Sequence, residues 1–230
     1  MTVSLDTLQI RALLLDIEGT TTPVEFVYQV LFPYARAHAA EYLARNQDSA
    51  ECGEAVALLR NEQTEEGTLE YAFSLMDRDK KSPGLKALQG LIWRDGYKSG
   101  ELRGQVYPDV LPAFERWRAR GRGIFIYSSG SVLAQQLLFG STNAGDLTPF
   151  LGGYFDTAVG PKVSADSYRV IAQRVHVPPA QILFVSDVGQ ELDAARTSGM
   201  RTALCVRGRG ELPPGSAVHP TIRTFDEIVD

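Results

Sequence analysis

The chain has 230 residues, enough for one large α/β domain or for a core with a smaller appendage. Its hydrophobic content of 44% is ordinary, and its net charge of −5 argues against broad nucleic-acid binding, which needs a clustered basic surface. No apolar run approaches about 18 residues and no secretory leader pattern is present, so we expect a cytoplasmic protein that does not associate with membranes.

Metal and disulfide chemistry based on cysteine or histidine is disfavoured. Cys52 and Cys205 lie far apart without CxxC spacing, and we interpret them as small buried residues. The three histidines show no zinc-binding spacing and are interpreted as structural or surface residues. No heptad pattern indicates an association between copies, so a monomer is expected.

The first predicted element of the core is a buried strand, Ile10–Leu15, followed by two acidic residues, Asp16 and Glu18. Carboxylates at the carboxyl end of such a strand lie where open α/β sheets bind ligands. They can share an oxygen-liganded cation such as Mg²⁺ and still offer an oxygen to a substrate. Taken alone, the motif fits a polar turn equally well, with Gly19 supplying a positive φ.

About 105 residues separate this strand from the next one, against roughly 30 for a whole βαβ unit. Apolar residues recur at helical spacing through the interval, for example at Leu85, Leu88 and Ile92. We therefore predict a helical domain, 23–106, inserted into a core made of 1–22 and 107–230. Because the insert begins and ends beside the first strand, we expect it to act as a lid.

The remainder of the core is predicted to alternate helices with strands. The apolar runs are Gly123–Tyr127, Gln181–Ser186 and Arg201–Val206, and the amphipathic helices are Asp109–Arg120, Ser164–Val175 and Glu191–Ser198. This alternation is typical of right-handed crossovers between parallel strands. The predicted fold class is therefore α/β, with a doubly wound, Rossmann-like parallel sheet and an inserted helical domain.

The second strand runs into Ser128, Ser129 and Gly130, directly before an amphipathic helix. Hydroxyls, backbone N–H groups and the helix dipole at such a place favour a bound anion. A serine here also serves as an ordinary helix cap. The two interpretations are compatible, so the motif is only moderately specific.

Lys162 follows a Gly-Pro pair just before the helix that opens at Ser164. In isolation such a lysine is more often a solvated surface charge. The tight apolar segment before it favours the alternative, a cation that holds a phosphate and neutralises a neighbouring aspartate.

The third strand ends at Asp187, which is predicted to face the same crevice as Asp16. Glu191 and Asp193 follow within the next helix. Acidic residues near a helix N-terminus are common for electrostatic reasons alone. Glu191 has a second interpretation, in which it hydrogen-bonds metal-bound water, and the sequence leaves both open.

The order of these four features along the chain resembles that of the haloacid dehalogenase-like phosphohydrolases, over 10–22 and about 107–206. The insert is similar to the helical cap of that superfamily. The segments 16–23, 93–102, 126–131 and 155–162 resemble more narrowly the acireductone synthases, the enolase-phosphatases of methionine salvage. Glu18 stands where the wider superfamily usually carries aspartate.

This resemblance implies a Mg²⁺-dependent phosphoric-monoester hydrolase with Asp16 as nucleophile. It implies one Mg²⁺ per chain, held by a side-chain oxygen of Asp16, the backbone carbonyl of Glu18, and Asp187. The Glu18 carboxylate is then available as general acid and base. The phosphoryl group would be bound by Ser128, Ser129, Gly130 and Lys162.

The implied substrate is a small phosphorylated molecule, 2,3-diketo-5-methylthiopentyl-1-phosphate, which is enolised and then dephosphorylated to the acireductone 1,2-dihydroxy-3-keto-5-methylthiopentene. Two alternatives remain at this stage. One is a related phosphatase acting on another small phosphomonoester. The other is a phosphoacceptor signalling module, which also uses a strand-end aspartate and a lysine but needs no inserted lid.

Overall fold

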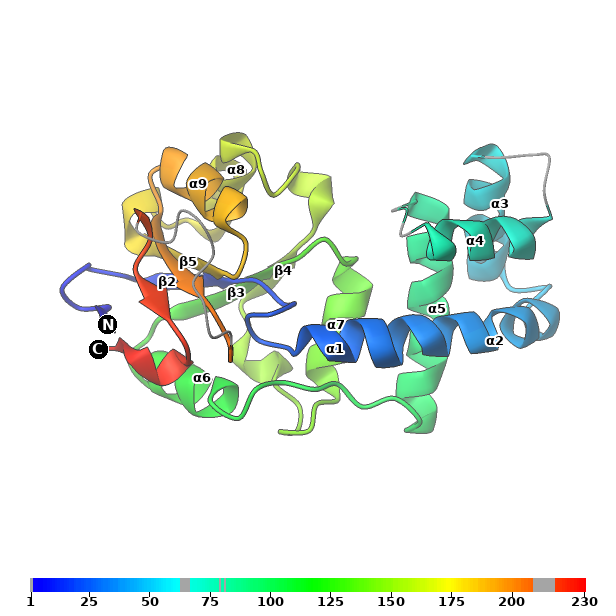
Figure 1. Cartoon of the computed structure of the whole chain (residues 1–230), viewed down its shortest axis with the longest axis horizontal. Coiled ribbons are helices and arrows are strands. Elements are labelled where there is room, and N and C mark those ends of the chain that lie inside the picture. The colour runs from blue at the N-terminus through cyan, green and yellow to red at the C-terminus, as the bar shows by residue number, and fades with distance from the viewer. Residues whose placement is uncertain (1, 63–66, 79, 81, 209–217) are drawn as a thin grey trace. The chain divides into compact units, whose positions relative to one another are not determined.

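The computed structural model describes residues 2–62, 67–78, 80, 82–208 and 218–230. These residues form two compact units (Figure 1). The core unit comprises Met1–Val24 and Gln105–Asp230, and the helical unit comprises Glu25–Gly104. Each unit is described by itself below.

The core unit is built on a parallel sheet with the strand order β4-β3-β2-β5-β6-β7. From β2 the chain adds β3 and β4 on one side and then returns to place β5 and β6 on the other. The winding direction therefore reverses at β2, and such a switch point is where ligands bind in open α/β sheets. The strands are β2 (Ala12–Leu15), β3 (Gly123–Tyr127), β4 (Gly153–Phe155), β5 (Ile182–Ser186), β6 (Arg201–Cys205) and β7 (Thr221–Ile222).

Helices cover both faces of this sheet, with α8 and α9 on one face and α6 on the other (Figure 1). The doubly wound α/β fold class predicted from the sequence is thereby confirmed. The helices of the core are α6 (Val110–Ala119), α7 (Val132–Gly140), α8 (Ala165–Val175) and α9 (Gly189–Thr197). A separate parallel pair joins the two ends of the chain, β1 (Val3–Ser4) with β8 (Ile228–Val229).

The central strands are held by aromatic packing under α8 and α9. Tyr168 of α8 meets Tyr127 of β3 edge-on at a ring separation of 5.5 Å and lies 5.0 Å from the ring of Phe184 in β5. All three side chains are fully buried, as is Leu14 of β2. Burial of side chains of this size contributes about 1.5–3 kcal/mol each, so the sheet gives the loops at its edge a firm base.

The helical unit contains α1 (Val24–Phe26, whose first residue belongs to the core unit), the π-helix η1 (Val27–Leu31), α2 (Phe32–Arg45), α3 (Ala50–Glu62), α4 (Thr68–Asp77) and α5 (Pro83–Ser99). Both α2 and α3 pack on α5. The Ser82 hydroxyl caps α5 by accepting from the Leu85 N–H at 2.9 Å. The indole N–H of Trp93 donates to the carbonyl of Leu31 at 2.8 Å, which ties the π-helix to α5.

Cys52 and Cys205 are buried and form no disulfide, in agreement with the sequence interpretation. No helix in the described part of the chain combines the length and the apolar character that crossing a membrane requires.

Candidate active site

The loop 16–22 leaves the carboxyl end of β2 at the switch point, and the register of the sheet determines its neighbours. Leu15 pairs with Val185 of β5, so the next residue along, Asp16, lies beside Ser186. The N–H of Asp16 extends the ladder by donating to the Val185 carbonyl at 3.0 Å. This hydrogen bond fixes the backbone position of Asp16.

The Asp16 carboxylate is only 3% exposed and is held through both of its oxygens. Its Oδ1 accepts from Nζ of Lys162 at 2.6 Å and from the N–H of Ile17 at 2.8 Å. Its Oδ2 accepts from the hydroxyl of Ser186 at 2.9 Å. These donors hold the buried carboxylate in one orientation.

Lys162 comes from the loop before α8 and is buried between two carboxylates. Its Nζ lies 2.6 Å from Asp16 and 2.7 Å from Oε2 of Glu191. Burial by itself would lower the pKa of Lys162, but the negative charges of Asp16 and Glu191 outweigh it and raise that pKa above its ordinary value. The lysine is therefore a buried cation and not the solvated surface charge of the simpler interpretation.

Glu191 lies within the same cluster, in the first turn of α9. Burial, followed by the nearby charge of Asp16, raises the pKa of Glu191 to about 7, against the opposing attraction of Lys162. Its Oε2 also lies 3.1 Å from the Ser186 hydroxyl. Because that hydroxyl has one hydrogen, it donates to only one of the carboxylates of Asp16 and Glu191 at a time.

Glu18 approaches the loop after β3. The hydroxyl of Ser128 lies 3.4 Å from Oε2 of Glu18, and the same hydroxyl accepts from the Gly130 N–H at 3.1 Å. The Ser128 N–H donates to the carbonyl of Phe155 as part of the sheet. Ser128 therefore offers a ligand its hydroxyl and not its amide, while Ser129 is partly exposed beside it.

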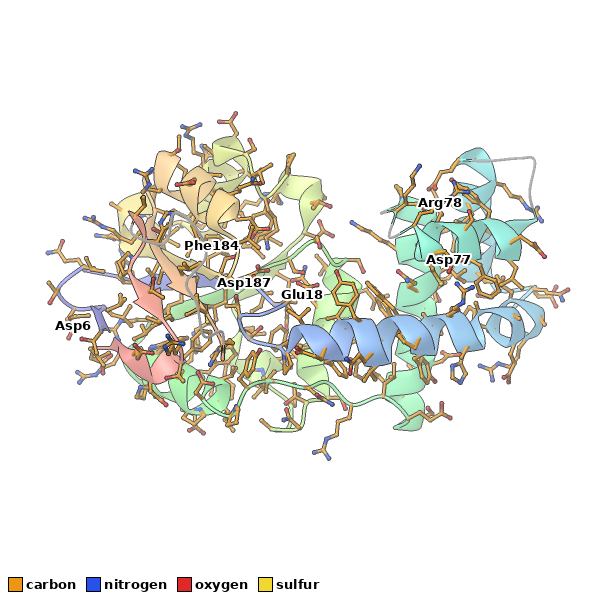
Figure 2. The ribbon with its side chains drawn as sticks, in the orientation of Figure 1. Asp6, Glu18, Asp77, Arg78, Phe184 and Asp187 are labelled. Carbon is orange, nitrogen blue, oxygen red and sulfur yellow. The ribbon has the colours of Figure 1, made fainter. Side chains whose placement is uncertain are left out.

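Asp187 follows β5 and packs directly against Gly19. A Cβ added to Gly19 would lie 2.4 Å from Oδ2 of Asp187, and Gly19 has a φ of +70°. Both observations favour glycine at this position. Figure 2 shows Glu18 and Asp187 at this same edge, so the structure brings the acidic loops after β2 and β5 together.

Two members of this cluster were missed or left undecided in the sequence interpretation. Ser186 received no role, although a hydroxyl at the last position of a buried strand, next to Asp187, is a usable signal. For Glu191 the sequence allows two interpretations, an ordinary acidic residue at a helix N-terminus or a residue of the site. Its contact with Lys162 places it in the site. Asp193 is exposed and pairs with the exposed Arg196, and its Oδ1 lies 3.3 Å from Nε2 of the buried His219.

Comparison with known proteins gives consistent matches over nearly the whole chain. Residues 10–199 match the family model of haloacid dehalogenase-like hydrolases. The chain is also similar to proteins named Enolase-phosphatase E1. The one from Synechococcus elongatus is 51% identical, and the match covers 95% of this chain and 98% of the relative. That of Citrobacter koseri is 49% identical, covering 95% and 96%.

Solved structures show the same similarity. The UTR4 protein of Saccharomyces cerevisiae superimposes with a TM-score of 0.80 at 32% identity, covering 94% of this chain and 99% of that one. CbbY of Rhodobacter sphaeroides, solved in complex with phosphate, has a TM-score of 0.60 at 17% identity, covering 94% and 95%, a likeness that concerns the fold alone.

Proposed function

The chain belongs to the haloacid dehalogenase-like hydrolase family, among its enolase-phosphatases, and from this membership we propose that it converts 2,3-diketo-5-methylthiopentyl-1-phosphate to the acireductone and phosphate in methionine salvage. The observation that carries the chemistry is the buried Asp16 carboxylate paired with Lys162 at the switch point. A phosphoacceptor module is disfavoured because the relatives that span this chain are named as enzymes.

Asp16 is the nucleophile in this proposal. Its carboxylate attacks phosphorus, forming a bond from oxygen to phosphorus while the bond to the ester oxygen breaks, and the leaving oxygen takes a proton from Glu18. Water then attacks the aspartyl-phosphate, assisted by the Glu18 carboxylate, and releases phosphate. The ammonium of Lys162 lowers the repulsion between the two anions that must approach each other. The Ser128 hydroxyl and the Ser129–Gly130 turn bind the phosphoryl oxygens.

The residues present fit one Mg²⁺ per chain. Side-chain oxygens of Asp16 and Asp187 and the backbone carbonyl of Glu18 form an all-oxygen donor set, which this ion prefers. Because Asp187 packs against Gly19, the loop after β5 lies next to the loop after β2, and this donor set needs ligands from both loops. Among the described residues no group of three or more Asp, Glu, His or Cys side chains is arranged to hold a metal ion, and the proposed set uses only two carboxylates. When bound, the ion would supply further charge neutralisation for the phosphoryl group.

The enolisation that precedes dephosphorylation requires removal of a proton next to a carbonyl. Glu18 is the proposed base, because its Oε2 lies beside the Ser128 hydroxyl, where the phosphoryl group would be held. One carboxylate would then serve both half-reactions. That the helical unit acts as a lid stays a prediction from the sequence, as do the monomeric state and the cytoplasmic location.

The proposal is tested by following the diketo substrate in the ultraviolet while phosphate is measured. We expect an enol intermediate and then acireductone, with activity stopped by EDTA and restored by Mg²⁺. Restoration by Zn²⁺ alone would argue for a different site. Phosphate release from unrelated monoesters, with none from the diketo substrate, would leave a phosphatase of different specificity and overturn the assignment.

Glu18→Gln tests whether one carboxylate serves both half-reactions. The amide has nearly the same shape but cannot take or give the proton, so both enolisation and phosphate release should slow by roughly 10²–10⁴-fold. Separate measurement of the enol signal and of phosphate distinguishes the two steps. An enol signal that accumulates without phosphate would restrict Glu18 to dephosphorylation. Normal phosphate release from a monoester that needs no enolisation would restrict it to enolisation, and unchanged rates in both steps would remove it from the mechanism.

Gly19→Ala tests the contact that brings Asp187 to the loop, and Gly121→Ala is its matched control. The two glycines have φ values of +70° and +71°, but a Cβ at Gly121 would meet nothing within 4 Å. Both variants should lose about 1–2 kcal/mol of stability from the left-handed backbone. Only Gly19→Ala should also lose phosphate release, by on the order of 10²-fold, together with stabilisation by Mg²⁺ in thermal melts. Equal activity in the two variants would contradict the role given to this contact.

A further inference from the structure

Arg207 contacts the loop 16–22 and has no role in the proposed reaction. It follows the end of β6, and its side chain is only 6% exposed. Its Nε donates to the backbone carbonyl of Thr20 at 3.0 Å. The guanidinium therefore binds the acidic loop through the main chain, at a point four residues from the nucleophile.

The guanidinium is itself held firmly. Its Nη1 donates to Oδ2 of Asp109 at 2.6 Å, and the Asp109 side chain is 8% exposed. The rings of Tyr107 and Phe225 lie 4.3 and 4.6 Å from its Cζ, and the N–H of Phe225 donates to the same Asp109 oxygen. A planar group fixed at this many points can serve as an anchor for the loop.

Hydrogen bonds within the loop 16–22 connect Thr20 to the residues that precede it. The carbonyl of Ile17 accepts from the N–H groups of Thr20, Thr21 and Thr22 at 2.9–3.1 Å. The Thr21 hydroxyl donates to the carbonyl of Asp16 at 3.1 Å. A displacement at Thr20 would therefore be passed to Ile17 and Asp16 through these hydrogen bonds, and to Glu18 through its peptide bond to Ile17.

We propose that Arg207, held by Asp109, is a positioning residue that sets the place of the nucleophile Asp16 and of Glu18 through the Thr20 carbonyl. This inference rests on the proposed phosphatase function. It assigns Arg207 an effect on turnover without contact with the substrate. Misplacement of reacting groups by about 1 Å costs on the order of 10²-fold in rate.

The chain offers a matched control at the amino end of β2, the strand whose carboxyl end leads into the loop 16–22. Arg122 is also buried, and its Nε donates to the backbone carbonyl of Ile10, just before β2. Its other nitrogens pair with Asp6 and Asp230. Arg122 therefore has the same kind of bonding as Arg207, but it acts at the amino end of β2, the end opposite to Asp16.

The experiment compares Arg207→Lys with Arg122→Lys in the full chain. In each variant the lysine keeps a positive charge near the carboxylates. It lacks the planar guanidinium, which in the parent also donates to a backbone carbonyl. The melting temperatures of both variants should therefore fall. For Arg207→Lys we expect kcat to drop about 10–100-fold with KM changed less than about threefold. Arg122→Lys should keep kcat within about twofold. Amide hydrogen exchange at Thr20–Thr22 should accelerate only in Arg207→Lys, a readout that does not depend on activity.

Each outcome decides the inference. A folded Arg207→Lys variant with the parent's kcat and unchanged exchange would overturn it. So would an equal loss of kcat in both variants, because that would indicate general destabilisation. A parent protein that releases no phosphate would overturn the proposed function first and the inference with it, whereas an active parent with an active Arg207→Lys variant would overturn the inference alone.

Discussion

Replacing Asp16 by asparagine is expected to reduce phosphate release by roughly 10⁴-fold or more, because an amide cannot form the covalent phosphoryl intermediate. The fold should be nearly unaffected. Asparagine keeps an acceptor oxygen for the Ile17 N–H, and Lys162 retains Glu191 as its partner. Phosphate assays and thermal melts on the same preparation measure the two effects.

The control for this variant is Asp166→Asn, which neutralises an exposed aspartate paired with Arg169 on α8. It removes the same charge from the core unit at a side chain that is 83% exposed to solvent, and it should keep the parent's turnover. Substantial residual turnover in Asp16→Asn, beyond what deamidation back to aspartate explains, would refute the nucleophile assignment.

Lys162→Met is the second change with a large expected effect, on stability as well as on rate. It leaves the carboxylates of Asp16 and Glu191 buried without their cation, and breaking a buried pair in this way typically costs about 3–5 kcal/mol. Loss of the positive charge beside the phosphoryl group should lower kcat by about 10²–10³-fold. Chemical denaturation and steady-state kinetics measure the two losses separately.

The double variant Lys162→Met with Glu191→Gln separates folding from catalysis. Neutralising Glu191 removes one of the two unpaired carboxylates, so part of the lost stability should return. Activity should remain low, because the cation is still absent. Recovery of phosphate release together with stability would mean that Lys162 matters only for folding.

The sequence was sufficient for the fold class and for most elements of the core. Leu13, Leu14 and Leu15 form an uninterrupted apolar run that is typical of a strand buried on both faces, and the structure places them in the centre of the sheet. The edge strands β4 and β7 were missed because three and two residues are too few to show a periodicity.

The contacts that organise the site depend on tertiary structure and were less predictable. The sequence indicated that Asp16 and Lys162 belong to one site, because Asp16 follows a predicted core strand and Lys162 follows a tight apolar segment just before a helix. It did not indicate that Ser186 bonds the nucleophile, since that follows from the register of β2 against β5. The bond from Arg207 to Thr20 joins residues 187 positions apart, and no local pattern marks it.

The covalent route through Asp16 is tested most directly by the configuration at phosphorus. The substrate is the thiophosphoryl analogue, made chiral by sulfur and two oxygen isotopes and hydrolysed in water of the third isotope. Two successive in-line displacements, first by the Asp16 carboxylate and then by water, each invert the configuration. The released thiophosphate should therefore show overall retention. Overall inversion would mean that water attacks the substrate directly, and it would contradict the role of Asp16 as nucleophile.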